Sequence, residues 1–586
     1  PVSFWTKLKT FQTIAQLLNF KTTIRNLVGN DMFRRLDTFT LNFLGTPIDA
    51  ALAKATGNSR TMLFRPIKAS QAQKLGYKEG WRLGLEDALL GINTSDEGTQ
   101  YELRRNRVFT TGPLAQAEMV MDIALRATDR AAVMATFRDS LAEQMELAGV
   151  DTATDEMTEN AMIIALYRTF QDDSTLAGMF STLKKGMNKI GSKDGEFGLG
   201  ELILKYPKTP ANILGRAIDY SPAGVVVTAL KLARDTSPKG SYLRQRMVAE
   251  GLSRAIMGTG LIATGVILAR MGILTGSNPD DDEDIYKLEK QYGLRDFSVN
   301  VSALFRHIMS GFTDSKAGEL RKGDRIASYD WAEPIAMGLA VGADIELGSG
   351  EAIDFLSTVV RAVEAGTTTL AEQPLLTGLS NLFRYGDITQ GMTQVVKSMP
   401  SSFTPTLFSH VAQFLDGRDT DPYTFYGTGQ QAWNLVQNRI PGLRGNIPSR
   451  YTVLGDEKRY YPEDQNLVTR ALNIFLNPSI TSKYMPTNEA QMIFDLYEDS
   501  GNPDIVPRPP QKTYTIDKVK YTFTPETWEE MSKWLGERYR DEIGYAMNTY
   551  MKGWSAEEQA DEIEWIIKEV KNEAKEKAVK LGKKVD

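Results

Sequence analysis

The most apolar run of the chain is Ala255-Ile-Met-Gly-Thr-Gly-Leu-Ile-Ala-Thr-Gly-Val-Ile-Leu-Ala269, which carries no charge and lies between Arg254 and Arg270. Its composition predicts a helix of about 15 residues, which is shorter than the roughly 20 residues that usually span a bilayer. Continuing through Met271–Leu274 adds length, because an arginine near the end of such a helix can reach the interface. We therefore expect either a buried core helix or a segment that meets a membrane in one state.

Glycines within this run would allow another helix to approach closely, as happens in membrane proteins and in tightly packed helix pairs. The apolar residues between them would form the contact surface. The residues expected to make this membrane or helix-packing segment are Gly258, Gly260, Leu261, Ile262, Gly265, Val266, Ile267 and Leu268.

The rest of the chain predicts a mainly α protein, elongated and built of many segments, with long loop-rich connections and a small C-terminal β-hairpin. Helical spacing of apolar residues marks 113–148 and 156–170, and small residues after Pro334 indicate another buried helix. Five regions are expected from composition. They are a basic helical region 1–110, a helical region 111–277, a helical core 278–400 after an acidic linker, an extended Pro/Gly/Tyr-rich region 401–486, and hairpin and helices 487–586.

The C-terminal region carries the clearest local signals. Thr513–Ile516 and Val519–Phe523 alternate around Asp517-Lys518, which is typical of a hairpin with a two-residue turn. Thr524-Pro525 predicts the start of one helix, and Ser555-Ala-Glu-Glu558 is a capping box that begins another.

Charge is spread unevenly along the 586 residues. Residues 1–85 hold thirteen basic and four acidic residues, a net charge of +9, and since the whole chain carries −6 the remainder carries −15. This asymmetry favours an anionic partner for the N-terminal part, such as nucleic acid, lipid headgroups or an acidic subunit. A basic amphipathic helix within 4–28 would either pack on its own protein or dock on a membrane or partner. The candidate contacts are Lys7, Lys9, Lys21, Arg25, Arg34 and Arg35.

Composition also excludes most of the catalytic and metal sites that are recognised by short sequence motifs. The chain has no cysteine and only two histidines, His307 and His410, so thiolate zinc sites, disulfides and His-rich metal sites are excluded. The Gly-rich stretch 191–200 lacks the Lys-Ser/Thr ending of a phosphate loop. The acidic linker 278–284 lacks the Gly and Glu of a calcium loop. We expect no enzyme activity, no cofactor and no metal, and both histidines in helix packing.

Several stretches, in order, resemble the C-terminal region of large polyvalent phage proteins and of phage internal virion (ejection) proteins. They are Ile24-Arg-Asn-Leu-Val-Gly-Asn30, the run 255–269, Phe297-Ser-Val-Asn, Gly323-Asp, Tyr329-Asp-Trp-Ala-Glu-Pro, Arg439-Ile-Pro-Gly-Leu and Ser555-Ala-Glu-Glu-Gln. These motifs consist of small apolar and turn residues rather than catalytic signatures.

The resemblance implies a structural protein of the virion interior, packaged in the capsid or at the portal. It would be ejected into the host periplasm or cell envelope to help form a conduit for genome DNA. Expected partners are further copies of the chain, the portal and other internal proteins, with transient DNA contact and contact with the host membrane. Two alternatives stay open: a static portal- or capsid-associated scaffold, and the non-catalytic end of a larger phage enzyme such as a virion RNA polymerase.

Overall fold

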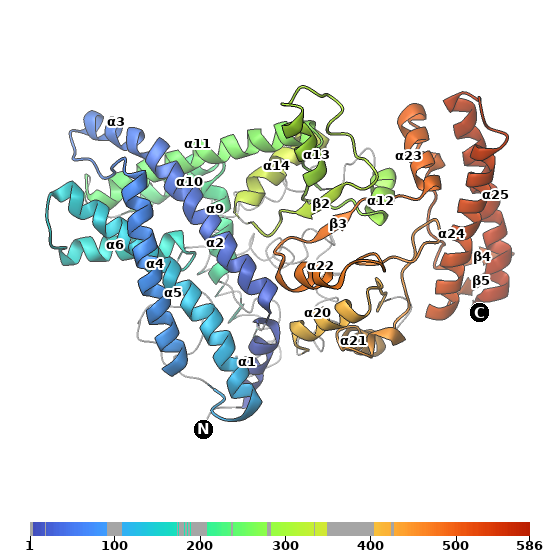
Figure 1. Cartoon of the computed structure of the whole chain (residues 1–586), viewed down its shortest axis with the longest axis horizontal. Helices are drawn as coiled ribbons and strands as arrows, with labels where there is room; N and C mark the ends of the chain where they lie inside the picture. Colours follow the sequence, from blue (N-terminus) through green and yellow to red (C-terminus); the bar gives the residue numbers. More distant parts are fainter. Residues whose placement is uncertain are drawn as a thin grey trace. The chain divides into compact units, whose positions relative to one another are not determined.

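The computed structural model describes residues 4–17, 19–90, 108–172 and scattered positions from 174 to 188. It also describes 208–348 except 236–237, 239, 278–282 and 333, and then 404–585 except 424–426 (Figure 1). This part of the chain is mainly helical, which confirms the predicted fold class. It forms two compact units that are interleaved along the sequence. Unit 1 takes Pro1–Ala269, Tyr329–Glu346 and Gly350–Val396, and unit 2 takes Arg270–Ser328, Leu347–Ser349 and Lys397–Asp586.

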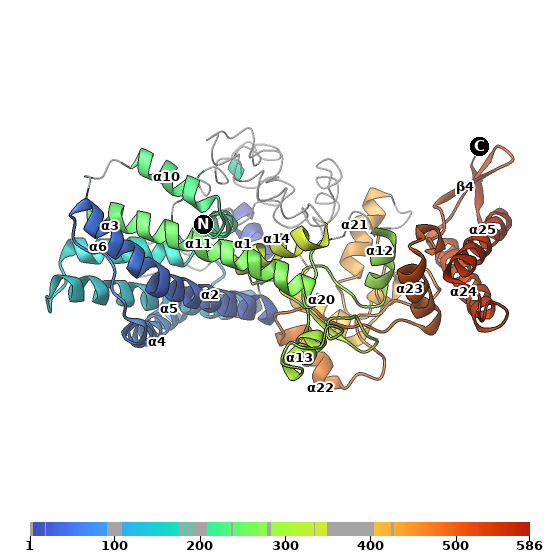
Figure 2. The same ribbon diagram turned by 90° about the horizontal axis from the view of Figure 1, so that it is seen from above.

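Unit 1 is built from helices, shown from blue to yellow-green in Figures 1 and 2. A π-helical turn η1 (Leu41–Gly45) directly follows the helix Phe20–Thr40. The helices are α1 (Phe4–Leu17), α2 (Phe20–Thr40), α3 (Thr46–Thr56), α4 (Pro66–Leu90), α5 (Gly112–Ala148), α6 (Asp155–Arg168), α9 (Lys208–Asp219), α10 (Gly224–Arg234), α11 (Tyr242–Arg270) and α14 (Ile335–Leu347).

The N-terminal segment is interrupted, whereas the sequence predicted one basic helix there. The side chain of Asn19 accepts a hydrogen bond from the Lys21 N–H and so begins α2. Ile14 and Leu17 of α1 pack against Met121 and Leu125 of α5. Of the two roles weighed for this segment, the described contacts are those of a helix that packs on its own protein.

The α4–α5 pair is held together by small residues on both helices. Gly76, Gly80 and Gly84 lie one turn apart on α4, and the two helices run side by side in both views (Figures 1 and 2). A Cβ atom at these glycines would lie only 2.8, 2.7 and 2.7 Å from the Cα atoms of three alanines of α5. Any larger side chain would push the two backbones apart. The alanines are Ala135, Ala131 and Ala127.

Unit 2 combines helices with two small antiparallel sheets, in the orders β1-β2-β3 and β4-β5-β6. The strands are β1 (Ser298–Asn300), β2 (Arg325–Ser328), β3 (Thr481–Lys483), β4 (Thr513–Ile516), β5 (Val519–Thr522) and β6 (Lys583–Val585). The helices are α12 (Glu283–Gln291), α13 (Val301–Met309), α20 (Thr406–Leu415), α21 (Thr428–Gln437), α22 (Leu467–Ala471), α23 (Asn488–Ser500), α24 (Pro525–Asn548) and α25 (Ala556–Leu581). Short turns complete it, namely η3 (Arg444–Asn446), η4 (Leu472–Leu476) and η5 (Pro503–Ile505).

The local signals of the C-terminal region are confirmed. Strands β4 and β5 pair with Tyr514 opposite Tyr521, and both turn residues have positive φ, 48° at Asp517 and 67° at Lys518. Thr524 caps α24, and the capping box of Ser555 and Glu558 begins α25. The third strand β6 was not predicted.

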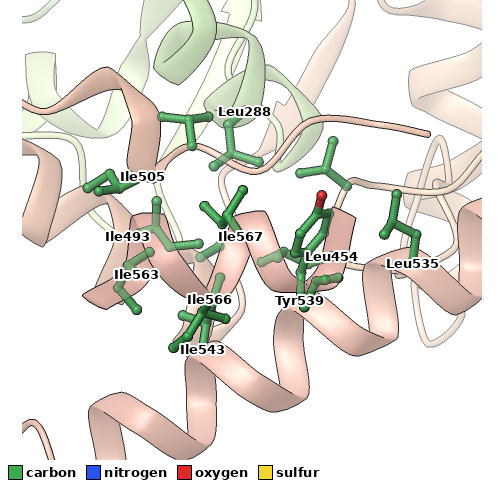
Figure 3. Packing of buried hydrophobic residues seen from close by; sticks show 14 of the residues in the cluster. Leu288, Leu454, Ile493, Ile505, Leu535, Tyr539, Ile543, Ile563, Ile566 and Ile567 are labelled. Atoms are coloured by element: carbon green, nitrogen blue, oxygen red, sulfur yellow. The ribbon is translucent and has the colours of Figure 1, made fainter. Parts of the chain in front are cut away.

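A core of large apolar side chains supports unit 2 (Figure 3). It is built mainly between α23, α24 and α25, with residues of α12 and of the loop around Leu454. Isoleucine, leucine and tyrosine side chains interlock there with almost no exposure. Figure 3 labels Leu288, Leu454, Ile493, Ile505, Leu535, Tyr539, Ile543, Ile563, Ile566 and Ile567.

The prediction of an extended region over 401–486 is wrong in part. Helices α20 and α21 lie within it, because Leu407, Val411 and Phe414 recur at helical spacing behind the N-cap Pro405. The end of the predicted helical core 278–400, the Gly-rich stretch 191–200 and most of the acidic linker lie outside the described residues. The five composition-based regions stay a prediction.

Candidate functional site

Helix α11 changes character along its length. Arg246, Glu250 and Arg254 follow one another at four-residue spacing and are buried, and from Ala255 onward the helix is apolar. Among the described residues it is the one helix long and apolar enough to cross a membrane, with a mean hydropathy of 1.6 over 18 residues. Of the residues in that window, 33% are buried. The core helix of a soluble protein can have the same length and hydropathy. Its composition alone therefore does not assign it to a membrane.

Two of the three glycines predicted to allow close approach make close contacts, Gly258 with the turn after α9 and Gly265 with helix α14. A Cβ atom at Gly258 would lie 2.7 Å from the backbone nitrogen of Ser221, and one at Gly265 would lie 3.0 Å from the Cα atom of Gly342 in α14. Gly260 needs a correction, because no described atom lies within 4 Å of a Cβ atom placed there. Gly260 therefore faces open space and is not used for packing within unit 1.

The apolar residues of the segment divide between the two sides of α11. Leu261 packs toward a cluster of Phe33, Phe170 and Tyr220, and faces Gly338 of α14. Ile262, Val266 and Leu268 are half-buried, and Ile267 is exposed. The same helix thus presents one packed side and one side with exposed apolar residues.

Asp37 of α2 is the centre of a buried charge network in unit 1. Its carboxylate has no exposed surface. The guanidinium of Arg254 lies 2.8 Å from one of its oxygens, and that of Arg168 lies 2.9 Å from the other. The hydroxyl of Tyr220 donates a hydrogen bond to the Asp37 carboxylate at 2.8 Å. Burial alone would raise the pKa of Asp37, but Arg254 and Arg168 outweigh it and lower the pKa.

Glu250 extends this network toward α5. Its carboxylate accepts hydrogen bonds from Arg246 at 2.8 Å and from Arg254 at 2.9 Å. Arg246 also pairs with Glu143 at 2.9 Å. Burial opposes ionisation of Glu250, yet the charges of Arg254 and Arg246 lower its pKa to about 2. The interior of unit 1 therefore contains a set of matched charges contributed by α2, α5, α6 and α11.

The basic residues predicted to contact an anionic partner differ in their exposure and in their pairing. Arg34 is corrected to an internal role, because its side chain is only 13% exposed and donates hydrogen bonds to Asp31 and Gln73. Arg35 is 75% exposed, but its Nε donates to Asp31 at 2.6 Å. Neither arginine is therefore an unpaired cation.

The other four candidates lie further toward the N-terminus. Lys7 is exposed on α1, and Lys21 lies half-buried in the first turn of α2. Arg25 is half-buried, and burial lowers its pKa against the opposing effect of Asp330. Lys9 belongs to α1, with its side chain outside the described set. Lys7 therefore remains the clearest cation presented to solvent.

Three phenylalanines form an exposed aromatic patch that sequence reasoning missed. The rings of Phe39 and Phe43 lie 4.6 Å apart, and those of Phe43 and Phe64 lie 5.3 Å apart. Their exposed fractions are 50%, 49% and 57%. The π-helical turn η1 places Phe43 beside Phe39, and such turns occur frequently at functional sites. The Phe-x-x-x-Phe spacing at 39–43 was the available signal.

Exposed lysines lie on α4, which starts directly after the aromatic patch. Lys68, Lys74 and Lys78 are exposed, and Ile67 beside them is one of the most exposed apolar residues of unit 1. Lys68 pairs with Glu146 of α5. In contrast, Asp49 of this region is fully buried, where it accepts hydrogen bonds from Thr61. The positive charge of the N-terminal part is thus presented outward more than its negative charge.

Neither histidine lies in a recognisable catalytic arrangement in the described chain. His307 is buried, its Nε2 lies 2.9 Å from the carbonyl oxygen of Met271, and its ring stacks on Phe312. His410 contacts the ring of Phe475. The described residues also hold no group of three or more His, Asp or Glu side chains able to bind a metal ion.

Comparison of the chain with protein-family models, with curated proteins and with solved structures finds no match.

Proposed function

We propose that this chain is a structural phage virion protein of the internal or ejection type. It would be packaged in the capsid or at the portal and delivered into the host envelope, where it helps to form a conduit for the genome. Unit 1 would be the part that engages the surface of a membrane. The proposal assigns it no catalytic residue.

The observation that supports this proposal is that unit 1 exposes a cluster of aromatic rings while it buries a network of charged side chains. Asp37, Glu250 and Arg254 are buried at its centre, whereas Phe39, Phe43 and Phe64 are exposed on its outside. Soluble proteins seldom leave contiguous apolar side chains in water unless these meet a partner. Charges buried in matched pairs together with exposed apolar residues suit a body that docks its outer face on an apolar surface.

The basic surface beside the aromatic patch favours lipid with anionic headgroups as that partner. Each lysine near an anionic bilayer surface contributes about 1 kcal/mol, and a buried ring adds its own transfer free energy. The remainder of the chain carries a net charge of −15, so an acidic surface on that part would repel the phosphates of DNA passing it. Both features suit a protein that lines a path without holding the DNA.

The direct test is quantification of the chain by mass spectrometry in three samples. They are intact particles, particles triggered to release DNA, and the membrane fraction of freshly infected cells. Loss from emptied particles with recovery in the membrane fraction is the expected result. Retention in emptied particles would instead indicate the static scaffold, and absence from particles would refute both virion roles.

A second test isolates the membrane contact. The full chain is floated with vesicles of phosphatidylcholine alone and of phosphatidylcholine with phosphatidylglycerol. We expect flotation with the anionic vesicles and its loss in the triple variant Phe39→Ser, Phe43→Ser and Phe64→Ser. A matched control replaces Phe305 and Phe408, which are similarly exposed in unit 2, and should float as the unchanged chain does. Equal loss in the control would refute the role of the patch.

A further inference from the structure

A pocket of about 150 Å³ lies within unit 2, at the first turns of α24. One wall is the extended chain Pro448–Val453, and a second is formed by Trp528, Ser532 and Leu535 of α24. Pro509 and Pro510 close a third side. A cavity of this volume can hold one aromatic or branched aliphatic side chain, which would lie against the apolar part of the lining formed by Trp528 and Leu535.

The walls of this pocket are held in place by contacts independent of any ligand. The extended chain pairs on both sides, since the Arg450 N–H donates to the Asp419 carbonyl and the Lys458 N–H donates to the Arg450 carbonyl, both at 2.8 Å. Gly455 of the following turn packs directly on Gly536 of α24. The pocket therefore belongs to the folded scaffold of unit 2.

Four ionisable side chains of opposite sign line the pocket, and three of them already have partners. Glu529 accepts from the Ser449 N–H and the Tyr451 hydroxyl, each at 3.4 Å. Asp421 accepts from the Tyr423 N–H at 3.0 Å.

Arg450 faces Asp421 at 3.7 Å. The carboxylates of the pocket are thus engaged by the protein itself.

Lys458 is the exception among these four groups. No carboxylate of the described residues lies within 4 Å of its ammonium group. Burial lowers its pKa, and the positive charges of Arg450, Lys290 and Arg295 act in the same direction against Asp419. Lys458 therefore has only the longer-range attraction of Asp419 to balance these positive charges, and a carboxylate that enters the pocket would complete its pairing.

We propose that this pocket binds an acidic peptide segment of a partner protein. One apolar side chain of the segment enters the cavity against Trp528, and a neighbouring carboxylate pairs with Lys458. A dianionic phosphate suits the site less well, because Asp421 and Glu529 also line it. A cationic side chain would meet Lys458 without a free carboxylate to accept it. The inference does not depend on the proposed function, since it concerns unit 2 alone.

The test uses three small probes that share one ring and differ in charge. They are 3-phenylpropionate, 3-phenylpropanamide and phenethylamine, and saturation-transfer difference NMR on the full chain reports their binding. We expect 3-phenylpropionate to bind about tenfold more tightly than the amide, as a charge-assisted hydrogen bond allows, and the amine not to bind. A tetrapeptide, acetyl-Gly-Phe-Asp-Gly-amide, should bind more tightly than 3-phenylpropionate, and its Asn counterpart should lose that advantage.

Two substitutions locate the binding. Lys458→Met should reduce 3-phenylpropionate binding to that of the amide, and Ser532→Trp should abolish binding of every probe by filling the cavity. Lys533→Met, at the exposed neighbouring position of α24, is the matched control and should change nothing. Circular dichroism confirms that each variant is folded. Unchanged binding in either pocket variant, preferential binding of phenethylamine, or no transfer to any probe at millimolar concentration would each overturn the proposal. Binding of the free acid without any peptide binding would overturn the peptide assignment.

Discussion

Units 1 and 2 are both mainly helical and both bury apolar side chains, but unit 1 also buries a network of paired charges. In unit 2, Ile543, Ile563 and Ile567 are buried among other large apolar side chains. In unit 1, the deepest groups include the carboxylate of Asp37 and the guanidinium of Arg254, and its closest helix pair meets through glycine and alanine.

This difference changes what holds each unit together. Apolar burial is non-directional and contributes in proportion to the area removed from water, so unit 2 should tolerate conservative changes of shape. A buried charge network is stable only while every member keeps its partner, and a glycine contact only while no Cβ atom is added. Unit 1 should therefore depend on a few particular residues far more than its size suggests.

Removing the central carboxylate should have the largest effect. Asp37→Ala leaves Arg168 and Arg254 buried without that partner, and we expect unit 1 to lose about 3–5 kcal/mol of unfolding free energy. Hydrogen exchange of α2, α6 and α11 amides in increasing urea measures it. Glu86→Ala, which removes an exposed carboxylate of α4 that pairs with the exposed Arg82, is the control and should cost less than about 1 kcal/mol. Similar losses in both variants would mean that the network is not what stabilises unit 1.

Truncating the apolar core should have a comparable but smaller effect, confined to unit 2. Ile543→Ala removes a fully buried side chain between α24 and α25, which costs about 2–5 kcal/mol. Val579→Ala on the exposed side of α25 should stay within about 0.5 kcal/mol. The same hydrogen-exchange experiment distinguishes the units, because α2 and α11 amides should not respond. If they respond equally, the two units unfold as one.

Lowering the pH should destabilise unit 1 before unit 2, without any substitution. The pKa of Glu250 is lowered to about 2 and that of Asp37 is also lowered, so these groups contribute stability that is complete above the ordinary carboxylate pKa. That stability is lost as the pH falls from about 4.5 toward 2. Hydrogen exchange across this window should show α2 and α11 opening before α24 and α25. Simultaneous opening, or earlier opening of unit 2, would contradict the assignment.

Local features of both units could be predicted from the sequence because their causes lie within a few residues. Ser555 and Glu558 form a capping box three residues apart, and Asp517-Lys518 is a complete turn by itself. Helices α5 and α14 and the apolar second half of α11 followed from apolar spacing and small residues, whereas the charged first half of α11, from Tyr242, was not predicted. These elements need no knowledge of distant partners.

The features that define unit 1 as a candidate site were not predictable in the same way. Asp37 and Arg254 are 217 positions apart, and either alone is an ordinary charged residue in a helix. Gly76, Gly80 and Gly84 show a visible four-residue spacing, but the alanines that they contact lie on another helix. At Gly260 the sequence predicted a packing contact that the described residues do not make. A glycine in an apolar run can face solvent as well as a neighbouring helix.

Gly265 and Gly260, both in α11, allow a matched test of close packing. Gly265→Ala places a Cβ atom 3.1 Å from the Leu339 carbonyl carbon, and we expect a loss of about 1–3 kcal/mol as α11 and α14 move apart. Gly260→Ala meets no described atom and should be neutral or stabilise by up to about 1 kcal/mol through helix propensity. Urea midpoints of unit 1 measure both. A loss at Gly260 equal to that at Gly265 would show that this face of α11 is occupied in solution.

The smallest effect on stability is expected at the aromatic patch, and it bears most directly on why the patch exists. Phe64→Ser removes a ring that is more than half exposed, so the unfolding free energy of unit 1 should change by only about 0.5 kcal/mol. Phe33→Ser in the same unit removes a fully buried ring that contacts Phe170 and Tyr220, and should cost about 3–5 kcal/mol. A loss above about 2 kcal/mol for Phe64→Ser would mean that the ring holds η1 against the start of α4. If folding does not need that ring, a partner that covers it is the physical reason for three phenylalanines to lie together in water.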